Sequence, residues 1–219
     1  MPPNATSNHG SGPSGRRRFL LAFLALALPV LGLAADTRTI LFFGDSLTAG
    51  YGLDPDEPAY PALIQQRIEE AGLNWRVVNA GLSGDTTAAG LRRLDWVLRQ
   101  RVDILVLELG GNDGLRGIPP DLSRANLQSM IDRARARYPD CTVVLAGMLL
   151  PPNMGEEYRG AFARIYPELA ERNRTPFIPF LLEGVGGIPE LNLADGIHPN
   201  ADGHRIVADN VWKVLSTLL

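Results

Sequence analysis

Four short segments of the chain contain the residue types that acyl transfer requires. Ser46 stands in Gly-Asp-Ser-Leu, Asn112 in Gly-Gly-Asn-Asp, and Asp195 precedes His198 by three residues, while residues 79–85 supply glycine-flanked backbone amides. A serine hydroxyl is a weak nucleophile that needs a base, and the base needs an acid to orient it. The tetrahedral oxyanion needs fixed hydrogen-bond donors. The four segments together therefore indicate acyl transfer by a serine.

Each of these residues also has a structural interpretation. Ser46 could cap a helix, Asn112 could occupy a turn and Asp195 could form an Asx-turn. Histidine is scarce: of the three in the chain, His9 lies in an N-terminal leader, and we expect His204, early in a helix, to be structural. The joint occurrence of all four elements, in order and after successive strands, favours the catalytic interpretation.

Apolar strands alternate with helical patterns and must position these segments. Strands are predicted over 38–43, 75–79, 103–109, 142–148 and 176–180, and helices over 60–71, 86–98, 123–137 (with Ser123 as N-cap), 156–172 and 200–218. This alternation indicates βαβ units and a parallel sheet, and continuously apolar strands indicate that both faces are covered. We predict an α/β fold, a three-layer α/β/α sandwich of about five strands.

The four segments follow the carboxyl ends of predicted strands, where ligands bind in open α/β sheets. We therefore expect them on one rim of the sheet. The glycine-rich segment 181–197 reads as a long loop, and loops of that length in compact domains are usually functional.

Several other site types lack their signatures in this sequence. There is no G-x-S-x-G nucleophile elbow, no P-loop lysine after the first strand, and no cluster with metal-ligand spacing. We predict no metal site and no cofactor.

Residues 1–35 differ in kind from the remainder. Three arginines at 16–18 precede an apolar run at 19–33 and then small residues, the order of a secretory signal peptide. The run of about 15 residues is shorter than the roughly 20 that a membrane span needs. We predict a cleaved signal peptide over 1–35, with twin-arginine export and an uncleaved anchor as alternatives. The mature chain, 36–219, would then be periplasmic or secreted.

The mature chain is acidic. The formal charge of −3 becomes −6 without the leader, which holds three arginines and no acid. Such a net charge gives no sign of the basic surface that binds nucleic acid or an anionic membrane. We expect a small-molecule substrate, no nucleic-acid partner, no membrane insertion of the mature chain, and a monomer.

The segments around Ser46, Gly84, Asn112 and Asp195–His198 resemble the four sequence blocks of the GDSL, or SGNH, hydrolases. The resemblance runs through residues 36–219. Segments 43–52 and 175–182 are most similar to a branch of bacterial periplasmic thioesterases, arylesterases and lysophospholipases. This resemblance implies a flavodoxin-like SGNH hydrolase fold with strand order 2-1-3-4-5, and hydrolysis of acyl esters or thioesters.

The resemblance also implies a role for each matched residue. Ser46 would be the nucleophile, His198 the base and Asp195 its orienting acid. The oxyanion hole would combine the backbone N–H groups of Ser46 and Gly84 with the Asn112 amide. Loops after the third and fourth strands would bind the acyl group, through Leu115, Arg116, Ile118, Leu149, Pro151 and Asn153, and Tyr158 and the loop 188–193 could contribute. The alternative is that these are ordinary connecting loops.

Two other functions stay open at this point. A carbohydrate acetylesterase could use the same centre. A flavodoxin-like module binding a flavin phosphate could use Ser46 and Asn112 as phosphate contacts, but it gives Asp195 and His198 no task.

Overall fold

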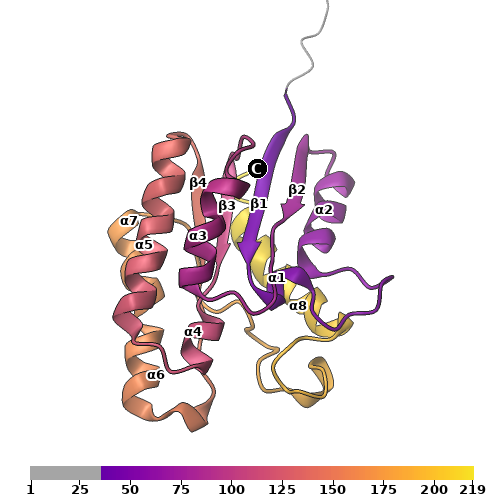
Figure 1. Cartoon of the computed structure of the whole chain (residues 1–219). Coiled ribbons are helices and arrows are strands. Elements are labelled where there is room, and N and C mark those ends of the chain that lie inside the picture. The colour runs from indigo at the N-terminus through magenta and orange to yellow at the C-terminus, as the bar shows by residue number, and fades with distance from the viewer. Residues whose placement is uncertain (1–35) are drawn as a thin grey trace, which may run out of the picture. The chain divides into compact units, whose positions relative to one another are not determined.

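Five apolar segments pair as parallel strands in the order β2-β1-β3-β4-β5 (Figure 1). The computed structural model describes residues 36–219, and its strands are β1 (Arg38–Gly44), β2 (Trp75–Asn79), β3 (Ile104–Glu108), β4 (Thr142–Ala146) and β5 (Phe177–Ile178). The central strands are buried on both faces because helices cover both sides. The predicted α/β sandwich and the flavodoxin-like strand order are confirmed.

Helices form a layer on each side of the sheet. The helices α3 (Thr87–Val97), α5 (Pro120–Arg137) and α7 (Ile165–Asn173) pack on one another in sequence, and α2 (Tyr60–Glu70) packs on α8 (Ala201–Leu215) (Figure 1). Shorter elements complete the chain: α1 (Ser46–Ala49), α4 (Gly111–Leu115), α6 (Glu156–Ala163) and the 3₁₀ turns η1 (Pro152–Met154) and η2 (Pro189–Leu191). The short helices α1 and α4 follow β1 and β3 directly, so they carry the first and third candidate segments.

The structure corrects three details of the predicted elements. The helix α5 begins at Pro120, whose fixed φ suits a first turn. Ser123 therefore lies inside the helix instead of capping it, and its hydroxyl donates to Asp113 Oδ1 at 3.0 Å. The single helix predicted over 156–172 is two helices that meet at Arg164. The last strand is only two residues long.

The predicted signal peptide lies outside the described residues. Within residues 36–219, no helix is both long enough and apolar enough to cross a membrane. The same part of the chain contains no group of three or more His, Cys, Asp or Glu side chains arranged to hold a metal ion.

His204 is a structural residue in α8, as expected. It is 1% exposed, and its Nδ1 accepts a hydrogen bond from the backbone N–H of Tyr60 at 3.2 Å. Its ring also stacks on the Tyr60 ring. Burial, aided by the charge of His198, lowers the pKa of His204 to about 4. The folded protein therefore holds this imidazole neutral as an acceptor.

This shifted pKa predicts a loss of stability in mild acid. Between the ordinary pKa of 6.5 and the folded pKa of about 4, the unfolded chain binds a proton that the folded chain does not, so stability falls as pH falls. From pH 7 to 5 the wild type should lose about 2 kcal/mol more unfolding free energy than His204→Asn. Asparagine keeps an acceptor but does not titrate, and other groups titrate in both proteins. Urea unfolding at the two pH values measures the difference, and equal losses would contradict the prediction.

Candidate active site

Ser46 lies at the carboxyl end of β1, as the first residue of α1. The cap of this short helix is Asp45, whose Oδ1 accepts from the N–H of Leu47 at 3.1 Å. Capping is therefore not the role of Ser46. The N–H of Ser46 belongs to the first turn, where helical N–H groups have no acceptor inside the helix.

His198 and Asp195 reach Ser46 from the loop between β5 and α8. His198 Nε2 lies 2.8 Å from Ser46 Oγ, and His198 Nδ1 lies 2.7 Å from Asp195 Oδ2. The ring of Tyr51 packs against the His198 ring, with centroids 4.7 Å apart. Ser46, His198 and Asp195 therefore form one continuous hydrogen-bonded chain, built from residues 152 positions apart.

Asp195 is fixed by its own turn. Its Oδ1 accepts from the backbone N–H groups of Ile197 at 2.9 Å and His198 at 3.0 Å, so the Asx-turn exists alongside the contact with the imidazole. Burial tends to raise the pKa of Asp195, but the hydrogen bonds from His198 and Ile197 outweigh it and lower the pKa to about 2. Asp195 is therefore a carboxylate at neutral pH.

The candidate oxyanion donors come from two other loops. Gly84 has a φ of 84°, which L side chains rarely adopt, in the loop after β2. Asn112 lies in α4, and its Nδ2 donates to Asp45 Oδ2 at 3.1 Å and to the backbone oxygen of Asp85 at 3.0 Å. Arg116 donates to the backbone oxygen of Gly84 at 3.1 Å. The Asn112 amide is therefore oriented by the residue that precedes Ser46.

Asp45 was not foreseen as an orienting residue. It is buried, and burial raises its pKa to about 6 against the lowering effect of hydrogen bonds from Leu47 and Asn112. Its position beside Ser46 in the sequence was the only available signal, because the contact with Asn112 spans 67 positions.

The chain is similar to several known proteins. The model of the GDSL-like Lipase/Acylhydrolase family matches residues 42–206. Esterase TesA of Pseudomonas aeruginosa is 45% identical over 203 residues, which are 92% of this chain and 100% of that protein. Thioesterase 1/protease 1/lysophospholipase L1 of Escherichia coli (strain K12) is 40% identical over 203 residues, which are 92% of this chain and 94% of that protein. The crystal structure of TesA matches with a TM-score of 0.79 at 45% identity, covering 83% of this chain and 100% of that chain.

The chain belongs to the GDSL-like lipase/acylhydrolase family.

The predicted family is thus confirmed, and the chain is an enzyme of the esterase class.

One cavity of this acylhydrolase opens at the candidate catalytic residues. It has a volume of about 500 Å³ and includes Ser46, Asn112 and His198 in its wall. Of the residues predicted to bind the acyl group, Leu115, Leu149 and Pro151 line it. Arg116, Ile118, Asn153 and Tyr158 do not.

The other four predicted residues lie elsewhere. Arg116 donates to the backbone oxygen of Gly84. The Tyr158 hydroxyl donates to the backbone oxygen of Ile118 at 2.7 Å, so these two connect α6 to the loop after α4. Asn153 is exposed in η1. Leu150, in the predicted loop after β4, also lines the cavity, whereas the sequence interpretation missed the apolar lining residues Met148, Phe180, Leu182 and Ile197. They come from the segments after β4 and β5, which end at the same rim as β1.

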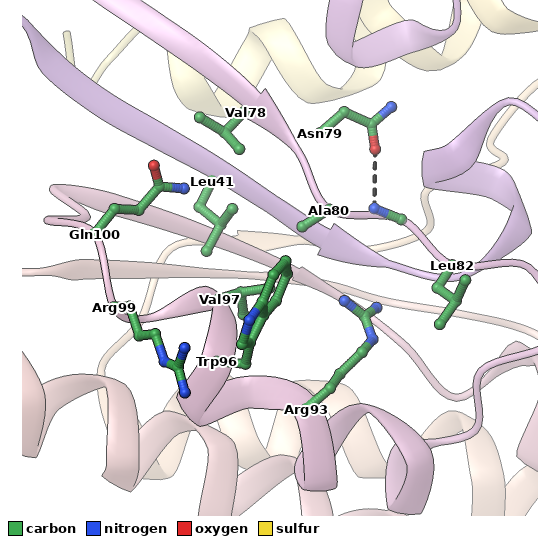
Figure 2. A pocket seen from close by; sticks show the side chains of 11 residues that line it. Leu41, Val78, Asn79, Ala80, Leu82, Arg93, Trp96, Val97, Arg99 and Gln100 are labelled. Carbon is green, nitrogen blue, oxygen red and sulfur yellow. Dashed lines mark hydrogen bonds between the residues drawn. The ribbon is translucent and has the colours of Figure 1, made fainter.

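A second cavity of this acylhydrolase, of about 560 Å³, lies between the edge strand β2 and α3. Figure 2 shows Trp96 of α3 facing Leu41 of β1, with Val78 of β2 and Arg93 of α3 farther along the same wall. Its wall contains no serine or histidine. The cavity at Ser46 therefore has the chemistry of an active site, and the cavity beside β2 does not.

Proposed function

We propose that this acylhydrolase cleaves carboxylic esters and thioesters through a covalent acyl-enzyme on Ser46. The observation that carries the proposal is the unbroken chain from Asp195 through His198 to Ser46, with contacts of 2.7 and 2.8 Å. A nucleophile in contact with a base, which an acid orients in turn, is the arrangement that acyl transfer needs.

Each member of the chain has one task. Ser46 Oγ attacks the acyl carbonyl while His198 Nε2 takes its proton, and His198 then returns the proton to the leaving alcohol or thiol. Asp195 accepts from His198 Nδ1, which keeps Nε2 free as an acceptor and stabilises the imidazolium. Water, deprotonated by His198, releases the acid and regenerates Ser46.

The negative charge on the carbonyl oxygen needs donors that are in place before the reaction. We assign this role to the N–H groups of Ser46 and Gly84 and to the Asn112 side chain. Both Asn112 Nδ2 protons are engaged at rest, with Asp45 and with the backbone of Asp85. The oxyanion must therefore share or replace one of these acceptors.

The acyl group is assigned to the 500 Å³ cavity, whose apolar side chains suit a hydrocarbon chain. The names of relatives that include an esterase and a thioesterase support both ester and thioester substrates. The leader predicted over residues 1–35 supports a periplasmic or secreted enzyme. We further propose that it acts on small molecules as a monomer.

A substrate panel tests the function. Para-nitrophenyl esters from acetate to palmitate and palmitoyl-CoA should all be hydrolysed. Activity confined to acetyl esters, with none on palmitoyl-CoA, would contradict the thioesterase assignment and favour a carbohydrate acetylesterase.

Narrowing the cavity at Ser46 should change the acyl-chain-length preference. Leu149 lines that cavity and is 49% exposed, so tryptophan can be introduced without disturbing the core. Leu149→Trp should lower kcat/KM for a decanoate ester by roughly ten-fold or more while sparing acetate, because excluding methylenes from an apolar pocket costs 1–3 kcal/mol. The ratio of the two kcat/KM values is the measurement.

Trp96→Ala is the matched control, since Trp96 lines the cavity beside β2 and not the cavity at Ser46. It should leave the ratio at the wild-type value. A shift in the Trp96 variant but not in the Leu149 variant would move the acyl site to the groove beside β2.

A further inference from the structure

A fully buried carboxyl group lies beneath the turn that carries Ser46. Glu108 is the last residue of β3 and is 0% exposed. Its Oε2 accepts from the backbone N–H of Asp45 at 3.2 Å and from the Thr48 hydroxyl at 2.7 Å. Its Oε1 has no hydrogen-bond partner among the described residues.

Both hydrogen bonds of the Glu108 side chain go to the turn that contains Ser46, residues 45–48. Asp45 precedes Ser46 and Thr48 follows it by two residues, so one oxygen joins both sides of the serine. The Thr48 hydroxyl is in turn 2.7 Å from the Tyr60 hydroxyl. The packing is tight enough that a Cβ on Gly44 would overlap Glu108 Oε2 and Thr48 Oγ1.

Glu108 contributes to stability as well as to geometry. A leucine in its place would leave the Asp45 N–H and the Thr48 hydroxyl without this buried acceptor, which costs free energy. Glu108 takes part in no ion pair within residues 36–219. Its two hydrogen bonds both go to residues that flank Ser46, so they also fix the geometry of that turn.

The surroundings of Glu108 favour the neutral acid. Burial, and then the charge of Asp45, raise its pKa well above the ordinary value, although hydrogen bonds from Thr48 and Asp45 oppose this. The other titratable groups near it, Tyr60 and Tyr166, are buried and have raised pKa values as well. The neutral acid can still accept both hydrogen bonds at Oε2, from the Asp45 N–H and from the Thr48 hydroxyl.

We propose that Glu108 is a positioning residue for acyl transfer, which holds the turn from Asp45 to Thr48 so that Ser46 presents its Oγ to His198 and its N–H to the oxyanion. This inference rests on the proposed role of Ser46. It adds a second layer behind the candidate triad, in a position that no substrate touches.

The test compares Glu108→Leu with Glu108→Gln. Leucine removes the acceptor, and a displacement of the turn should lower kcat by about 10- to 100-fold with KM nearly unchanged. Glutamine keeps an oxygen acceptor and should recover most of the lost turnover. Steady-state kinetics with para-nitrophenyl butyrate and urea unfolding are measured on each protein.

Asp103 provides a control at the opposite end of the same strand, because it immediately precedes β3. It is buried, and its Oδ2 accepts from the backbone N–H of Thr39 at 2.8 Å. Its Oδ1 pairs with the more exposed Arg38 and Arg101. Asp103→Leu should lower the urea midpoint but leave kcat at the wild-type level. A role of Glu108 in stability alone would give the same result for Glu108→Leu.

A folded Glu108→Leu protein with wild-type kcat would overturn the proposal, and so would Glu108→Gln if it were as slow as Glu108→Leu. If the leucine variant does not fold, Thr48→Val removes the same connection with little change in shape. It should then lower kcat at constant KM, and wild-type kcat would again overturn the proposal. Ser46→Ala separates the two ideas, because an active Ser46→Ala protein contradicts the proposed function itself.

Discussion

Replacement of Ser46 by alanine should lower kcat for para-nitrophenyl acetate by about a million-fold. Without Oγ no acyl-enzyme can form, and His198, oriented by Asp195, has no hydroxyl group to deprotonate. Because the members of such a chain act as a unit, losing the nucleophile costs as much as losing all of them. The activity that remains would come from the oxyanion donors and binding alone.

Initial rates should be paired with labelling by a fluorophosphonate. The wild type should gain one adduct on Ser46, located by peptide mass, and Ser46→Ala should gain none. Ser216→Ala, at the end of α8, is the control and should react like the wild type. Retained turnover in Ser46→Ala would contradict the serine mechanism.

Asp195→Asn should have the second largest effect, a loss of about 10⁴-fold in kcat. The asparagine oxygen can still accept from the N–H groups of Ile197 and His198, so the turn persists. Its NH₂ group, however, would face His198 Nδ1 and donate to it. That contact requires the tautomer with the proton on Nε2, which donates to Ser46 instead of accepting from it.

The pKa of Asp195 extends this prediction to pH. Since that pKa is lowered to about 2, the carboxylate stays charged at neutral and mildly acidic pH. Protonation of Asp195 should therefore not limit activity in this range. Asp202→Asn, an exposed acid in the first turn of α8, is the control and should keep the wild-type rate. A wild-type rate in Asp195→Asn would assign the orientation of His198 to another group.

Local patterns in the sequence were enough to predict most of the fold. Strand positions follow from apolar runs such as residues 38–43, and α8 follows from its periodicity and from Asn200, which caps it. The errors fell where local signals compete or are missing. The two prolines at 119 and 120 started α5 before Ser123, and no local signal marked the break at Arg164.

The sequence by itself determined the identity of the chemistry. Ser46, Asn112, Asp195 and His198 could be identified because each lies in a short segment that follows a predicted strand and has residue types suited to acyl transfer. The tertiary structure alone decided the contacts between them, such as the 2.8 Å approach of His198 to Ser46. It also decided which of the two cavities meets these residues, and it placed Glu108 beneath the turn. The physical reason is range: periodicity and capping depend on neighbours in the chain, whereas convergence and burial depend on strand order and on the paths of loops far apart in sequence.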